Sequence, residues 1–173
     1  MSTSADVAGE HETETGRSWW QAGALGGVVG AVGFGLLLMV IAPDFLAAMV
    51  PALYGVEPIT AVGWLAHLAH GLILGVVFGA LVEREVVMMH IRGDVETDAL
   101  DETGPMLRTI GAGVVYGLAV WAILPVLVMP AWLGAVGFAG APTMPAVAIE
   151  TLAGHLLYGL LLGAVYAVTA GRR

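Results

Sequence analysis

Four ionisable side chains interrupt the long apolar segments of this sequence: His67, His70, His155 and Glu150. On insertion scales an Arg, Lys or Asp at the centre of a membrane helix costs roughly 2.5–3.5 kcal/mol, so ionisable groups there need a reason to be present. An imidazole can ligate haem iron or a metal ion, carry a proton, or hydrogen-bond a neighbouring helix. These four side chains are therefore the candidate functional residues.

Two of these histidines, His67 and His155, stand at matching positions. Each lies about two helical turns inside its apolar segment, counted from the end farther from the chain's charged loops. Paired imidazoles can ligate a haem of the b type between helices, and His70 shares a helix face with His67. The pattern predicts an accessory or cofactor-binding subunit with haem b as the candidate cofactor. Neighbouring glycines leave little room for a macrocycle unless the helices splay.

Three alternatives remain open at this stage. His67, His70, His155 and Glu150 could hold a metal ion, although Glu150 lies about 140° around the helix from His155. A small transporter or channel subunit could use Glu150, Tyr158 and the histidines as a polar path, with Pro125 breaking the third helix. In a purely structural protein, neutral histidines would hydrogen-bond Tyr158, Tyr116 or backbone carbonyls. We find no catalytic motif and predict no enzymatic activity.

These residues lie on four apolar segments, at 22–42, 61–82, 108–129 and 146–170. About 20 residues at roughly 1.5 Å per residue cross the hydrocarbon layer of a bilayer. The chain is 58% hydrophobic and only 12% charged. The sequence therefore predicts an all-α membrane domain of four helices at 21–170, with an acidic tail at 1–20 and an acidic loop at 83–107.

Arginine positions predict the orientation of these helices. All six basic residues are Arg, and the segments 43–60 and 130–145 contain none of them. Because basic loops stay in the cytoplasm, both termini and the loop 83–107 should lie inside the cell membrane. The two apolar segments on the other side should form short surface helices that cap the histidine cleft.

The two halves of the chain align as an internal repeat. With Gly27 placed on Gly113, a slip of one residue brings Pro43 onto Pro130, and a slip of two brings His67 onto His155. Two spans per half make the repeat parallel. The small residues that follow each histidine every fourth position predict close helix packing, at Gly71, Gly75, Gly159 and Gly163.

Sulfur chemistry receives little support from the sequence. The chain has no Cys, so it has no disulfide and no thiolate ligand. Met39, Met49, Met129 and Met144 gather toward the predicted outer side and would be soft ligands in a copper carrier. Without a Met-x-x-Met pair, we interpret them as core packing.

The segments Gly63-Trp64-Leu65-Ala66-His67 and Gly154-His155-Leu156-Leu157-Tyr158-Gly159 resemble an uncharacterised family of small four-helix membrane proteins. That family occurs in halophilic archaea and some bacteria, and the resemblance covers roughly residues 20 to 170. It implies the fold and the membrane location, and no activity.

The charge balance agrees with a halophilic source. The net charge is −8 and the chain contains no Lys, which excludes a nucleic-acid partner. The expected partners are the lipid bilayer and a homo-oligomer or larger membrane complex.

Overall fold

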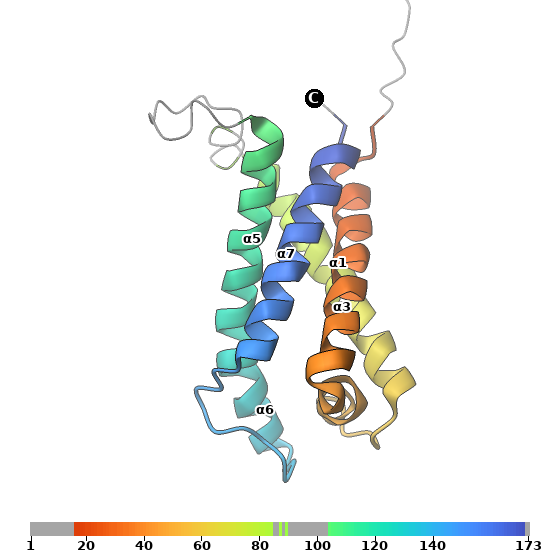
Figure 1. Cartoon of the computed structure of the whole chain (residues 1–173), viewed down its shortest axis with the longest axis vertical. Helices are drawn as coiled ribbons and strands as arrows, with labels where there is room; N and C mark the ends of the chain where they lie inside the picture. Colours follow the sequence, from red (N-terminus) through yellow and green to blue (C-terminus); the bar gives the residue numbers. More distant parts are fainter. Residues whose placement is uncertain (1–15, 85–86, 88, 90–103, 172–173) are drawn as a thin grey trace, which may run out of the picture.

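The chain folds into a bundle of four long helices, and the part of it that the structure describes contains no strand (Figure 1). The computed structural model describes residues 16–84, 87, 89 and 104–171. The long helices are α1 (Trp19–Ile41), α3 (Thr60–Val82), α5 (Pro105–Ile123) and α7 (Ile149–Thr169). All four are long and apolar enough to span a membrane, which confirms the predicted all-α membrane protein. The predicted acidic tail and most of the loop 83–107 lie outside the described residues.

Short helices extend two of the long ones at the end of the bundle opposite the termini, which we call the capped end. The π-helical segment η1 (Phe45–Met49) and α2 (Val50–Ala52) follow α1, and η2 (Leu124–Val128) and α6 (Met129–Ala135) continue α5. The third span therefore runs from Pro105 to Ala135 rather than over 108–129.

Pro125 does not break this helix, contrary to prediction. The helix instead widens there, and Met129 N–H donates to the carbonyl of Leu124, five residues earlier. A wide π turn tolerates a proline that cannot supply the usual backbone donor.

The ends of two other spans also differ from the predicted ones. α1 begins at Trp19, three residues before the apolar run, because Ser18 caps it and its N–H donates to Gln21 Oε1 over 3.2 Å. α7 begins at Ile149 rather than 146. Ala146 N–H instead donates to the carbonyl of Val126 over 3.0 Å, a carbonyl that Pro130 cannot serve because it has no N–H.

Glycines set the spacing within each helix pair. A Cβ built on Gly27 of α1 would lie 2.9 Å from Cα of Gly75 on α3. A Cβ built on Gly113 of α5 would lie 2.9 Å from Cα of Gly163 on α7. Gly71 and Gly159, the other two predicted packing positions, lie in the same two seams. Both pairs therefore pack backbone against backbone, which van der Waals attraction favours in lipid.

The four helices do not pack equally. α1 packs closely on both α3 and α7, and α7 packs on α5, whereas among the described residues α3 and α5 make almost no close backbone contact. Tyr116 of α5 bridges part of this gap by donating to the carbonyl of Leu74 over 2.8 Å. Toward the capped end the gap stays open as a cavity.

The two ends of the described chain meet at the opposite end of the bundle (Figure 1). Arg17 N–H donates to the carbonyl of Thr169, and Gly171 N–H donates to the carbonyl of Arg17, both over 2.9 Å. Both ends of the described chain therefore lie at the same end of the bundle.

Candidate functional site

A cavity of about 510 Å³ lies between α3 and the continuous helix formed by α5, η2 and α6. That volume suits a small ligand. Its wall is mostly aliphatic and aromatic. The polar side chains that line it, which define what we call the histidine cavity, are His67, His70, His155, Tyr54 and Tyr158.

His67 and His155 each donate one ring N–H to a backbone carbonyl. His67 Nε2 lies 3.0 Å from the carbonyl oxygen of Ala31 on α1, and His155 Nδ1 lies 2.7 Å from that of Thr151 on α7. A carbonyl can only accept, so these nitrogens carry the protons of the neutral rings. The other nitrogen of each ring, Nδ1 of His67 and Nε2 of His155, is left as an acceptor. No residue among those described donates a hydrogen bond to either.

Phe34 of α1 occupies the space between the two histidines. Its ring centroid lies 5.1 Å from that of His67 and 4.7 Å from that of His155, edge-on to both. The side chain is 4% exposed, and a Cβ built on Gly154 would overlap its ring. Because Phe34 is seated on Gly154 between the imidazoles, the residues present do not fit a haem ligated by His67 and His155.

The histidine cavity is covered at the capped end by the short helices. Tyr54, just after α2, contacts Nε2 of His70 through its hydroxyl, and the two rings stack at 5.9 Å. Trp132 of α6 donates its indole N–H to the carbonyl of Leu53 over 2.8 Å. Both apolar segments thus reach the histidine cavity, but the second continues the third span instead of forming the separate surface helix that the sequence predicts.

Two tyrosines hydrogen-bond across the bundle. Tyr158 of α7 donates to the carbonyl of Gly71 over 2.9 Å, in the same way as Tyr116 bonds Leu74. Neither tyrosine hydrogen-bonds a histidine. His67 and His155 do bond backbone carbonyls, as expected of a purely structural protein, but they do not bond Tyr116 or Tyr158. Phe34, Tyr54 and Trp132 are the site residues that the sequence analysis missed.

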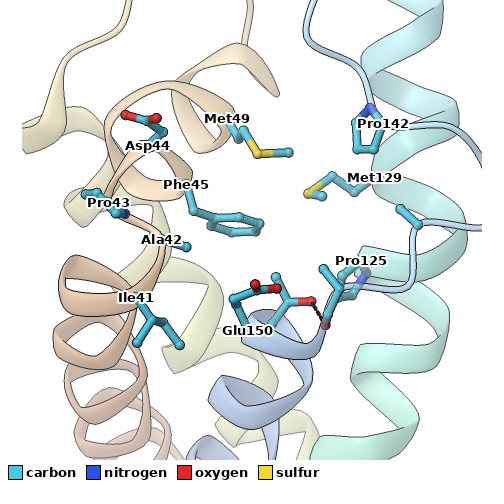
Figure 2. Close-up of a pocket in the computed structure, with 13 residues that line it drawn as sticks. Ile41, Ala42, Pro43, Asp44, Phe45, Met49, Pro125, Met129, Pro142 and Glu150 are labelled. Atoms are coloured by element: carbon cyan, nitrogen blue, oxygen red, sulfur yellow. Dashed lines mark hydrogen bonds between the residues drawn. The ribbon is translucent and has the colours of Figure 1, made fainter.

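Glu150 lies outside the histidine cavity and lines a second cavity of about 450 Å³ at the capped end (Figure 2). We call this second space the methionine cavity; its functional groups are those of Asp44, Met49, Met129, Glu150 and Thr151. Phe45, Pro125 and Met129 line both cavities, so the two adjoin. No hydrogen bond joins Glu150 to a histidine in the described part of the chain.

The predicted metal set does not assemble. Within residues 16–84 and 104–171, no three His, Asp or Glu side chains gather closely enough to hold a metal ion. His67, His70 and His155 line one cavity while Glu150 lines the other.

Comparison with protein-family models, with curated proteins and with solved structures found no match. The site's own geometry is therefore the basis for proposing a function.

Proposed function

We propose that this multi-pass membrane protein binds a lipid-soluble ligand that carries a hydroxyl group, such as a quinol or another phenol, in the histidine cavity. The observation that carries the proposal is that His67 and His155, each with one ring nitrogen left as an acceptor, both line this mostly apolar cavity. Each of these nitrogens could accept a hydrogen bond from a ligand hydroxyl, and such a bond typically contributes about 0.5–1.5 kcal/mol.

The shape of the cavity supports a ligand that arrives from the lipid. Ile73 of α3 and Val128 of η2 both line the cavity and are 58% and 49% exposed at the bundle surface. The cavity thus reaches the lipid-facing gap between α3 and α5. A ligand head placed at the histidines would leave its apolar tail to extend through this gap into the bilayer.

This proposal keeps the predicted cofactor-binding role and replaces its cofactor. Phe45, Pro125 and Met129 lie between the two cavities. No hydrogen-bonded chain connects Glu150 to the histidines in the described residues. Both observations favour a bound ligand over the passage of a solute.

We also propose that the protein lies in the cell membrane with both termini in the cytoplasm, so that the capped end faces outward. The support is the sequence pattern, in which every Arg falls on the side of the termini. The equivalent glycine seams, Gly27 on Gly75 and Gly113 on Gly163, support the proposal that the two helical hairpins are repeats.

Filling the cavity should weaken binding. We expect Ile73→Trp to weaken binding of decyl hydroquinone by roughly tenfold or more. A loss of about 1.4 kcal/mol of binding free energy is enough to lower the affinity tenfold. Leu65→Trp is the matched control, because Leu65 lies on the same helix, is 72% exposed and does not line the cavity. The measurement is equilibrium binding to the protein in lipid nanodiscs under reducing conditions. Unsaturable partitioning of the probe into wild-type discs, or equal binding by both variants, would rule the site out.

A further inference from the structure

Two methionines from separate hairpins come together in the methionine cavity. Met49 is the last residue of η1, and Met129 is the first residue after η2. Figure 2 shows their side chains pointing toward one another across the cavity, from opposite walls. Met49 therefore ends one π-helical segment and Met129 directly follows the other, and such segments are often found at functional sites.

These two methionines differ from the others that the structure places at the bundle surface. Met39 is 50% exposed, Met106 is 54% exposed and Met144 is 62% exposed. Met49 and Met129 are half-buried and still border open space rather than filling it. Packing alone, which is the interpretation that the sequence favours, does not account for two thioethers that face a cavity of about 450 Å³.

The surroundings of the two sulfurs favour a cation. The cavity wall includes the carboxylates of Asp44 and Glu150 and no basic side chain. Glu150 points into the cavity from the first turn of α7 (Figure 2). Thioethers are soft ligands that select Cu(I) over hard divalent ions, and a nearby carboxylate adds favourable charge.

We propose that Met49 and Met129 form a binding site for a soft monovalent metal ion, Cu⁺ or its analogue Ag⁺. The thioether Sδ atoms are the ligands, and Glu150 supplies the counter-charge. A hard divalent ion would need more oxygen or nitrogen ligands than gather here, because the described residues contain no cluster of three His, Asp or Glu side chains. This site adjoins the histidine cavity, which Met129 also lines, but its proposal does not depend on the proposed ligand.

X-ray absorption of the protein loaded with Cu⁺ under ascorbate tests the ligands directly. The chain has no Cys, so any sulfur in the first shell must come from methionine. We expect sulfur scatterers in the wild-type protein. A first shell of nitrogen and oxygen alone would overturn the proposal, and this measurement needs no variant to fold.

Substitution then locates the sulfur atoms. Met49→Leu combined with Met129→Leu nearly conserves side-chain volume and should preserve the fold. It should weaken Cu⁺ binding, measured by competition with a chromophoric chelator, by roughly tenfold or more. The matched control is Met39→Leu combined with Met144→Leu, which should bind as the wild type does. Unchanged affinity in the first variant, or an equal loss in the control, would overturn the site.

Discussion

Replacing Gly113 by Val is expected to separate α5 from α7 and to destabilise the bundle by about 3 kcal/mol, the upper end of the usual overpacking cost. A Cβ at Gly113 would lie 2.9 Å from both the Cα and the N of Gly163. Those atoms belong to the backbone of α7, which cannot rotate away as a side chain can. The whole of α7 would have to move, and the contacts along the seam would weaken with it.

A second glycine on the same helix provides the control. A Cβ at Gly111 would have no neighbour within 4 Å, so Gly111→Val should leave the stability nearly unchanged. The free energy of unfolding of both variants can be compared with that of the wild type by denaturant titration in mild detergent. Equal midpoints for Gly113→Val and Gly111→Val would show that the seam between α5 and α7 is not as close as described.

Truncating Phe34 to Ala should have an effect of similar or greater size. Removing a buried Phe costs about 3–5 kcal/mol in well-packed interiors, because the surroundings collapse only partly. Phe34 is 4% exposed and packs against the rings of His67 and His155 and on the backbone of Gly154. Its loss would leave a void and remove the contact that fixes the two imidazoles.

Leu36→Ala is the matched control for this truncation. Leu36 also lies on α1, but it is 55% exposed, so its loss should cost much less in the same unfolding experiment. A similar loss of stability in both variants would contradict the role of Phe34 as the packed centre between the histidines.

The four spans could be predicted because each apolar run is long enough to cross a bilayer, whatever its neighbours are. The ends of the helices could not, since they depend on particular bonds. Ser18 caps α1, so the helix begins before the apolar run. Ala146 N–H donates to the Val126 carbonyl, which Pro130 cannot bond because it has no N–H. Hydrophobic length also cannot distinguish a break at Pro125 from the π turn that carries the helix onward.

The site was predictable only in part, because the predicted repeat implies equivalent packing in the two halves, which the helices do not show. The aligned histidines should have equivalent partners, yet His67 donates to α1 while His155 donates within α7. α1 packs on α7, whereas α3 and α5 stay apart, and this difference creates the histidine cavity. Phe34 gave no signal at all, since one more aromatic residue in an apolar run has no distinctive spacing.

The most direct test of the account compares the reduced and oxidised forms of one probe. Decyl hydroquinone has two hydroxyl donors, whereas the corresponding quinone has only acceptors, and the two differ little in size. A site with acceptor nitrogens on His67 and His155 should bind the reduced form about tenfold more tightly, from a difference of about 1.4 kcal/mol. His155→Phe, which keeps a ring and removes the acceptor, should reduce this preference. Equal affinity for both forms in the wild-type protein, or tighter binding of the quinone, would contradict the account.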